Sequence, residues 1–460
     1  MAQNKKKGKY ELGYHITAPK GLLNDPNGLI QFRGIYHVFY QWNQEGTTHS
    51  TKSWGHVTSN DLIHWTTQPV ALEPNKWFDK DGCYSGSAVS FENKLYLFYT
   101  GNVRNEKNER ESYQCLAVSE DGINFEKKGP VIKQPPGYTA HIRDPKVWQA
   151  KNGDWWMLLG AQKKDLTGDA LIYQSTNLVD WMCKGSLIDY MDDFGFMWEC
   201  PDLVHFEQES VFIFSPQGLK AKGDEFNNLY HSGYLTGVFT KEGKFLPDTK
   251  LFKELDRGFE FYAPQTFQDS KGRQILFGWM GVMEPEVEAA VPTIKHGWIH
   301  NLTIPRELIY ADNQLKQQPV VELKQLRYGL PQVIIGKTNQ SFQLLTLQNE
   351  ILFDWKKTAG SFMFQIRKEI VVEYDEKKRR IKVTRTSWLN GNKESRAVTL
   401  KGPLTQMQWF LESSTLELFV NNGEEVFSLR YFPEQEENRI DICFCRTGKE
   451  PEITVYSLEQ

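Results

Sequence analysis

The sequence lacks the features that mark membrane proteins, exported proteins and disulfide-rich domains. No run of about 18 apolar residues occurs, so no membrane-spanning helix is expected. Residues 1–14 are basic but lack the apolar stretch of a signal peptide, and we expect no export. The 6 cysteines are scattered without a C-x-x-C pair, which argues against a disulfide framework or a zinc knuckle. A reducing cytoplasm suits this pattern.

A surplus of basic charge is also missing. Lys plus Arg number 54 against 58 Asp plus Glu, a formal net charge of -4 without a basic stripe, so no nucleic-acid partner is expected. His37 and His56 have no second ligand at metal-binding spacing and are predicted to be strand residues. We expect neither a metal nor another cofactor. The oligomeric state stays open, a homo-oligomer included.

The sequence does contain a repeat of about 55 to 63 residues, the spacing typical of radial architectures. Five apolar segments of strand character recur: 35–40, 95–99, 155–159, 211–214 and 275–278. A loop element recurs three times, at 59–65, 119–125 and 175–181. A third element precedes each apolar segment and contains, in turn, Asp25, Ser85, Asp144, Glu199 and Tyr262, at steps of 60, 59, 55 and 63.

Five such units, with no convincing amphipathic helix between them, predict an all-β fold that begins with a five-bladed β-propeller at residues 1–315. The repeat stops there, and residues 316–335 are interpreted as a linker. Residues 336–460 alternate apolar and polar residues between turns, which predicts a C-terminal antiparallel β-sandwich. Equivalent positions of successive blades lie around one axis, so the repeat brings three carboxylates to one end of the channel.

Two of these carboxylates have the residue contexts of a retaining glycosidase, which needs two carboxyl groups about 5 to 5.5 Å apart. Asp25 lies in Asn-Asp-Pro-Asn-Gly, where flanking amides can keep a carboxylate ionised, and we assign it as the nucleophile. Glu199 follows Met197 and Trp198, bulky neighbours expected to raise its pKa and suit a proton donor. Asp144 follows Arg143, which is expected to keep it charged while it stabilises the transition state.

Each motif taken singly has an ordinary structural explanation. Asp-Pro and Asn-Gly are common turn pairs, Arg143-Asp144 resembles a structural ion pair, and Trp54 and Trp279 are by default core residues. The shared phase of the carboxylates in the repeat is what favours the functional interpretation.

The motifs together resemble the signature blocks of glycoside hydrolase family 32, the invertase and fructanase family. The blocks are Asn24-Asp25-Pro26-Asn27-Gly28, Arg143-Asp144-Pro145 and Glu199-Cys200-Pro201, with weaker ones through residue 308. The resemblance covers about residues 12 to 310 and implies a β-fructofuranosidase with Asp25 as nucleophile, Glu199 as acid/base and Asp144 holding fructose. It also implies a substrate pocket lined by Asn24, Gln41, Trp54, Ser87, Arg143, Tyr262 and Trp279.

The substrate is predicted to be sucrose 6-phosphate, with His49 and Lys52 as candidates to bind its phosphate. An intracellular β-fructosidase for sucrose or short fructo-oligosaccharides is the alternative within this class. An inverting five-bladed glycosidase, whose carboxyls would be about 6.5 to 9.5 Å apart, is a third hypothesis. A catalytically inactive sugar-binding propeller is the alternative from another class, and it would be expected to have lost a carboxylate.

Overall fold

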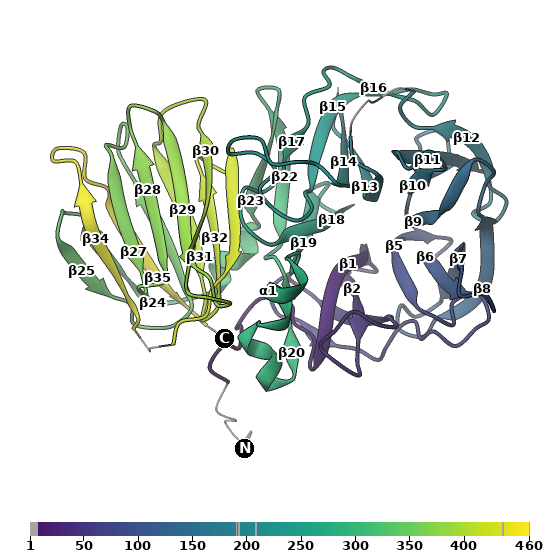
Figure 1. Ribbon diagram of the computed structural model, residues 1–460, viewed down its shortest axis with the longest axis horizontal. Helices are drawn as coiled ribbons and strands as arrows, with labels where there is room; N and C mark the ends of the chain where they lie inside the picture. Colours follow the sequence, from purple (N-terminus) through teal and green to yellow (C-terminus); the bar gives the residue numbers. More distant parts are fainter. Residues whose placement is uncertain (1–7, 190, 192–193, 208, 435–436, 460) are drawn as a thin grey trace.

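The computed structural model describes residues 8–189, 191, 194–207, 209–434 and 437–459. These residues form seven sheets: five arranged around a common centre and two stacked beside them (Figure 1). Apart from the parallel pair β1 and β20, the paired strands are antiparallel. Three short helices lie between strands: α1 (Pro285–Ala289), η1 (Pro292–His296) and η2 (Val321–Leu326).

The five sheets of the ring follow the chain in order. The first has the order β20-β1-β2-β3-β4 and comprises Trp298–Ile299, Gly21–Phe32, Ile35–Asn43, Ser53–Ser59 and Thr66–Thr67. The second, β5 to β8, comprises Cys83–Phe91, Lys94–Arg104, Arg110–Ser119 and Glu126–Lys133. The third, β9 to β12, comprises Tyr138–Gln149, Trp155–Lys163, Gly168–Ser175 and Met182–Ser186.

The last two sheets of the ring have one short strand outside the main path. The fourth sheet, β13 to β17, comprises Met197–His205, Ser210–Gln217, Gly233–Phe239, Phe245–Pro247 and Lys253–Glu254, and β17 is the strand outside the path. The fifth sheet, β18, β19, β21, β22 and β23, comprises Phe261–Gln268, Gln274–Met280, Asn301–Leu302, Arg306–Ala311 and Gln314–Pro319, and β21 is the strand outside the path.

The first strand of each sheet lies at the centre of the ring. β1 contacts β5, β5 contacts β9, β9 contacts β13, β13 contacts β18, and β18 returns to β1. Apolar side chains fill the space between neighbouring sheets; between the first two, for example, Phe39 and Trp54 meet Leu97 and Tyr99. Because sheets bury apolar faces best against one another, this ring hides both faces of every sheet. The five predicted units are thus the five sheets of the ring.

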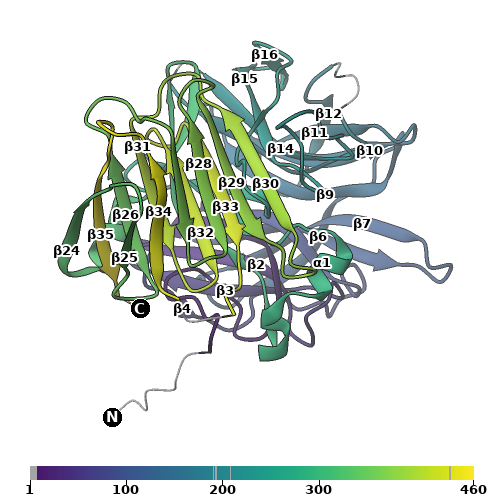
Figure 2. The ribbon, with the colours of Figure 1, turned by 60° about the vertical axis from the view of Figure 1, so that its left-hand side comes forward.

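The remaining two sheets have six strands each and stack face to face (Figure 2). The first, in the order β24-β35-β26-β31-β32-β33, comprises Arg327–Ile335, Glu452–Leu458, Asn349–Asp354, Gln406–Leu411, Thr415–Val420 and Glu425–Arg430. The second, β25-β34-β27-β28-β29-β30, comprises Gln340–Gln343, Arg439–Cys445, Phe362–Ile366, Ile370–Asp375, Arg380–Thr386 and Lys393–Thr399. A continuous apolar core that includes Phe353, Phe364 and Trp409 lies between them.

The predicted fold class, a β-propeller followed by a β-sandwich, is confirmed. The segment interpreted as a linker, 316–335, is instead mostly regular structure. It contains the end of β23, the helix η2 and the strand β24, which pairs with β35 in the sandwich. We propose that the connection between the two domains is the short stretch between β23 and η2. None of the helices among the described residues has the length and apolar character to span a membrane.

The thrice-repeated loop element forms the same turn each time. Ser59, Ser119 and Ser175 end third strands, and each hydroxyl donates to the Asx oxygen two residues later. That oxygen in turn accepts the backbone N–H groups two and three residues further on. This is the Asx-turn that such residues favour, so the repeat in the sequence is a repeated connection to the outermost strand.

Candidate active site

All five central strands are irregular at the same repeat position. In each, the pairing with the second strand shifts register around the residue that the repeat singled out: Asp25, Ser85, Asp144, Glu199 and Tyr262. A bulge bends the strand and redirects the side chains next to it, and bulges occur often beside active sites. Proline, which cannot donate to the ladder, lies in three of these bulges, at Pro145, Pro201 and Pro264.

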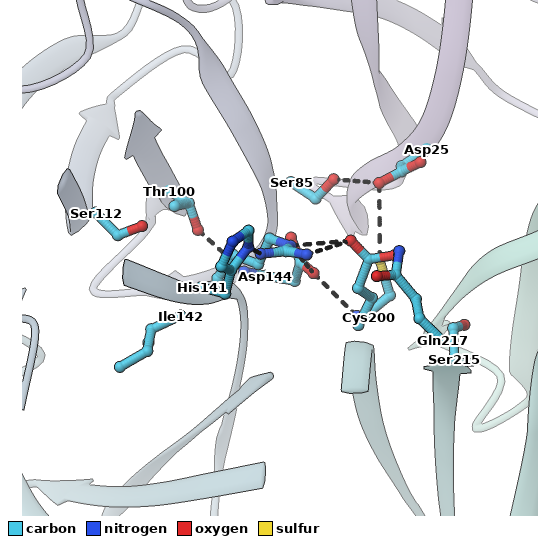
Figure 3. A network of polar contacts seen from close by, with 12 residues as sticks. Asp25, Ser85, Thr100, Ser112, His141, Ile142, Asp144, Cys200, Ser215 and Gln217 are labelled. Atoms are coloured by element: carbon cyan, nitrogen blue, oxygen red, sulfur yellow. Dashed lines mark hydrogen bonds and ion pairs between the residues drawn. The ribbon is translucent and has the colours of Figure 1, made fainter. Parts of the chain in front are cut away.

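The carboxyl of Asp25 lies against Ser85 of β5 and Cys200 of β13 (Figure 3). Oδ2 accepts a 2.6 Å hydrogen bond from Ser85 Oγ and a 3.3 Å bond from Gln41 Nε2. Oδ1 accepts from Asn24 Nδ2 at 3.2 Å, and Cys200 Sγ lies 3.7 Å from Oδ2. The flanking side-chain amide of Asn24 therefore donates to the carboxyl, and donors from Ser85 and Gln41 help to fix its orientation.

The electrostatic environment of Asp25 is a balance of opposing effects. Burial raises the pKa of Asp25, the bond from Ser85 lowers it, and the nearby Glu199 charge raises it, with a net increase. The carboxyls of Asp25, Asp144 and Glu199 influence one another, so they titrate as a cluster.

The carboxyl of Glu199 is held from both sides by donors. Arg143 donates to Oε1 from Nε at 2.9 Å and from Nη2 at 2.7 Å. Gln217 Nε2 donates to Oε2 at 2.7 Å, and the phenol of Tyr262 donates to the same oxygen at 2.6 Å. The prediction that bulky apolar neighbours surround this carboxyl is wrong, because Trp198 turns away to pack against Phe214.

Asp144 is buried and has a left-handed backbone, with φ of 64°. Its Oδ2 accepts a 3.0 Å hydrogen bond from the backbone N–H of Cys200, and its own N–H donates to Thr100 Oγ1 at 3.0 Å. Arg143 is 3.9 Å away and bonds Glu199 instead. Burial raises the pKa of Asp144 to about 7, against the opposing effect of Arg143. Arg143 thus favours the charged form of Asp144, as expected, but burial has the larger effect on its pKa.

Most of the residues predicted to line the pocket converge on these carboxyls. Besides its bond to Asp25, Asn24 Nδ2 donates to Gln41 Oε1 at 3.1 Å. Trp279 lies beside this pair, since its Nε1 donates to the carbonyl of Leu23 at 3.0 Å. Together with Arg143 and Tyr262 at Glu199, these side chains form one connected polar site.

Two predicted pocket residues have other roles in this structure. Trp54 has no exposed surface, its ring packs against Phe39 with centroids 5.8 Å apart, and its Nε1 donates to the carbonyl of Tyr84. Ser87 Oγ donates to the carbonyl of Pro145 at 2.7 Å, so it ties two central strands together. The serine that contacts Asp25 is Ser85, whose Oγ donates to Oδ2, and the role of Ser87 in lining the pocket stays a prediction.

Besides Ser85, three further residues of the site were not predicted. Gln217 binds Glu199, Cys200 contacts both Asp25 and Asp144, and His141 Nδ1 lies 3.0 Å from Arg143 Nη1. Ser85 had a signal in the sequence, since it shares the repeat phase of the carboxylates. Gln217 had none, because it ends a second strand.

The chain that carries this site matches two protein-family models. Residues 15–319 match the model "Glycosyl hydrolases family 32 N-terminal domain", and residues 322–458 match "Glycosyl hydrolases family 32 C terminal". The chain belongs to glycoside hydrolase family 32. This confirms the family resemblance, and with it the assignment of the chain as a glycoside hydrolase rather than an inactive propeller.

Similar proteins agree with the family over nearly the whole chain. The sucrose-6-phosphate hydrolase of Bacillus subtilis (strain 168) is 46% identical over 427 residues, which cover 91% of this chain and 88% of that protein. The sucrose-6-phosphate hydrolase of Lactobacillus gasseri has a solved structure with a TM-score of 0.88 at 30% identity, covering 98% of this chain and 93% of that one. A Bombyx mori family 32 β-fructofuranosidase, solved in complex with sucrose, has a TM-score of 0.87 at 32% identity and covers 98% and 94%.

Of the two residues proposed to bind phosphate in this family 32 enzyme, His49 and Lys52, the first lies beside Trp279, with ring centroids 6.0 Å apart. His49 Nε2 is 3.0 Å from Glu288 Oε1, which also accepts from His300 at 2.8 Å. Lys52 is 4% exposed, and its ammonium has no hydrogen-bond partner among the described residues. Burial lowers the pKa of Lys52 to about 8, against the attraction of Asp25 and Glu288.

A metal site would need a group of ligand side chains. Within the described ranges, no group of three or more His, Cys, Asp or Glu residues is arranged to hold a metal ion.

Proposed function

We propose that this chain hydrolyses the fructosidic bond of sucrose 6-phosphate with retention of configuration. The observation that carries the proposal is the convergence of Asp25, Asp144 and Glu199 from three different sheets, with Cys200 in contact with both aspartates. The similarity to sucrose-6-phosphate hydrolases along more than nine-tenths of the chain supports the choice of substrate.

The proposed reaction has two displacements. In the first, Asp25 Oδ attacks the anomeric carbon of the fructosyl group while Glu199 gives a proton to the oxygen of the departing glucose 6-phosphate. The carbon–oxygen bond to glucose breaks as the bond to Asp25 forms. In the second, Glu199 takes a proton from water, which attacks the same carbon and releases Asp25. The donors from Arg143, Gln217 and Tyr262 hold Glu199 in position for both steps.

The remaining side chains are assigned to the fructosyl group. Asp144 is buried beside Asp25 and Glu199, and we assign it to hydrogen bonds with sugar hydroxyls that strengthen in the transition state. Asn24, Gln41 and Trp279 line the other side of Asp25 and are assigned to substrate binding. Trp54 and Ser87 are assigned to support of the strands that carry the site.

A kinetic comparison of sucrose 6-phosphate, sucrose, kestose and inulin tests the proposed substrate. We expect kcat/KM to be highest for sucrose 6-phosphate. Equal values for sucrose and its phosphate would contradict the proposal and favour the second candidate, a β-fructofuranosidase for unphosphorylated sucrose. The likeness to the Bombyx mori enzyme supports this second candidate.

The stereochemistry separates the retaining mechanism from an inverting one. NMR of the first-formed fructose should show the β-anomer, because two inversions at the anomeric carbon restore its configuration. The α-anomer as first product would assign the chain to the inverting hypothesis.

We infer that the enzyme acts in the cytoplasm. Its 6 cysteines are all unpaired, and Cys183 and Cys443 are exposed, which suits a reducing compartment. Cell fractionation tests this inference, and enzyme found outside the cell would contradict it. A homo-oligomer stays a prediction, to be tested by light scattering.

A further inference from the structure

An arginine without a carboxylate partner lies beside the site, at the end of the hairpin formed by β6 and β7. Arg110 begins β7, opposite Arg104 at the end of β6. In the described part of the chain, the Arg104 guanidinium donates to the carbonyl of Asn108 and the Arg110 guanidinium contacts His141 and Tyr84, and neither forms an ion pair with a carboxylate. Like charges directly opposite each other across two strands are destabilising. Glu109 and Glu111 balance the charge of the hairpin, but their carboxylates accept from Asn105, so the Arg110 guanidinium itself remains available to an anion.

Arg110 is positioned against the catalytic strands. Its guanidinium lies over the ring of Tyr84, 5.8 Å from the centroid, and Tyr84 immediately precedes Ser85. Its Nη1 is 3.5 Å from His141 Nδ1, which is also 3.0 Å from Arg143 Nη1. A row of one guanidinium, one imidazole and a second guanidinium thus leads from Arg110 to Glu199.

His141 adds a neutral donor to this row. Guanidinium groups only donate, so Nδ1 of His141 accepts and the ring hydrogen is on Nε2. Burial, together with Arg143 and Arg110, lowers the pKa of His141 to about 4, so the ring is neutral near pH 7. Both contacts use Nδ1, so the Nε2–H of His141 can donate to a ligand oxygen.

The row lies where the leaving group departs. Glu199 protonates the oxygen that leaves with glucose, so the glucose ring lies next to Glu199. The 6-phosphate is one sugar ring away from that oxygen. Arg110 lies beyond Glu199 in this row, separated from it by the Arg143 guanidinium and the His141 ring.

The opposite rim of the site is less suited to a phosphate. There His49 is bound to Glu288, and the bonds from His300 and His49 outweigh burial and lower the pKa of Glu288 to about 2. A phosphate dianion at His49 would meet this carboxylate, and the ammonium of Lys52 is buried.

We propose that Arg110, with the Nε2–H of His141, binds the 6-phosphate of the departing glucose. The planar guanidinium presents two parallel N–H bonds that match two phosphate oxygens, and a phosphate monoester carries nearly two negative charges at neutral pH. The assignment rests on the proposed function, because it concerns a group that only sucrose 6-phosphate possesses.

The test measures kcat/KM for sucrose 6-phosphate and for sucrose in wild type, R110A, R110K and K107A. Lys107 is an exposed cation at the turn of the same hairpin and serves as the matched control. In R110A we expect the ratio of the two values to fall about ten- to hundredfold, the range for charge-assisted hydrogen bonds. R110K should show a smaller fall in this ratio, since lysine keeps the positive charge but cannot donate two parallel N–H bonds. K107A should keep the wild-type ratio.

Product inhibition provides a binding readout. Glucose 6-phosphate should inhibit sucrose hydrolysis more strongly than glucose in wild type, and this difference should disappear in R110A. A wild-type preference for sucrose 6-phosphate that survives in R110A, or an equal loss in K107A, would overturn the Arg110 assignment. A wild type that shows no preference at all would instead contradict the proposed function, so the two failures are distinguishable.

Discussion

The phenol of Tyr262 donates a 2.6 Å hydrogen bond to Oε2 of Glu199, although 63 residues separate them. Burial raises the pKa of Tyr262 well above its usual value, so the phenol keeps its proton. Together with Arg143 on Oε1, this bond fixes the plane of the proposed acid/base. The orientation of Glu199 therefore depends on two neighbouring sheets.

Replacement of Tyr262 by phenylalanine removes only the phenol oxygen. We expect kcat to fall about tenfold or more, with a smaller change in KM, because a misoriented acid/base affects bond breaking more than binding. Tyr230 provides a matched control, since its ring centroid lies 5.9 Å from that of Tyr262. Equal losses in Tyr230→Phe and Tyr262→Phe would argue against orientation as the cause.

The two proposed catalytic carboxyls allow a direct test. Asp25→Asn and Glu199→Gln should each lower kcat by at least about a thousandfold, because each removes a group that takes part in bond breaking. Circular dichroism and Tm measurements would establish that both variants fold. Asp121→Asn, in a surface turn, is the control and should keep wild-type turnover. Turnover near the wild-type level in either catalytic variant would refute that residue's role.

The hydrogen bond from Ser85 predicts the position of the acid limb in the pH profile. Asp25 must be ionised to attack, so kcat/KM falls as the pH decreases through the pKa of the carboxyl cluster. The Ser85 bond lowers the pKa of Asp25. Its removal in Ser85→Ala should therefore move the acid limb to higher pH. Profiles of kcat/KM from pH 4 to 8 measure this shift.

Ser87→Ala distinguishes the two serines of this strand. Ser87 bonds the backbone of β9 rather than Asp25, so its loss should lower Tm without moving the acid limb. A shift of the acid limb in Ser87→Ala with none in Ser85→Ala would instead assign the influence on Asp25 to Ser87.

The choice between these serines shows where sequence reasoning reaches its limit. The carboxylates could be predicted because the length of a four-stranded sheet fixes the repeat, and equivalent positions then meet at the centre. Ser85 and Ser87 are two positions apart, and in a regular strand their side chains would share one face. The register shift at Ser85 breaks that equivalence, and no hydrophobic pattern predicts a bulge.

The electrostatics of Glu199 could not be predicted for a related reason. Its sequence neighbour Trp198 packs into the core between sheets, whereas its actual partners Arg143 and Gln217 come from β9 and β14. Local composition describes the environment of a side chain only where the chain does not bend sharply. The regular structure within residues 316–335 also depends on distant contacts, because η2 has buried residues and β24 pairs with β35.

A buried ion pair between the N-terminal segment and the sandwich predicts a pH-dependent stability. His15 Nε2 is 2.8 Å from Glu417 Oε1, and Nδ1 contacts Glu412. Glu417 also binds Arg306 of the propeller, so the pair joins the two domains. Burial alone would lower the pKa of His15, but Glu412 and Glu417 outweigh it and raise the pKa to about 9.

The sign of the effect follows from linkage. Below pH 6.5 the histidine is protonated in both the folded and the unfolded chain, and the stabilisation is complete. As the pH rises toward about 9, only the folded state holds the proton, and the contribution of about 3 kcal/mol at most is progressively lost. The difference in unfolding free energy between wild type and His15→Gln should therefore be largest near pH 6 and shrink by pH 9. Urea unfolding at several pH values measures it, with the exposed His64→Gln as control. A difference that stays constant across this range would mean that His15 stabilises the domain junction by packing rather than by its charge.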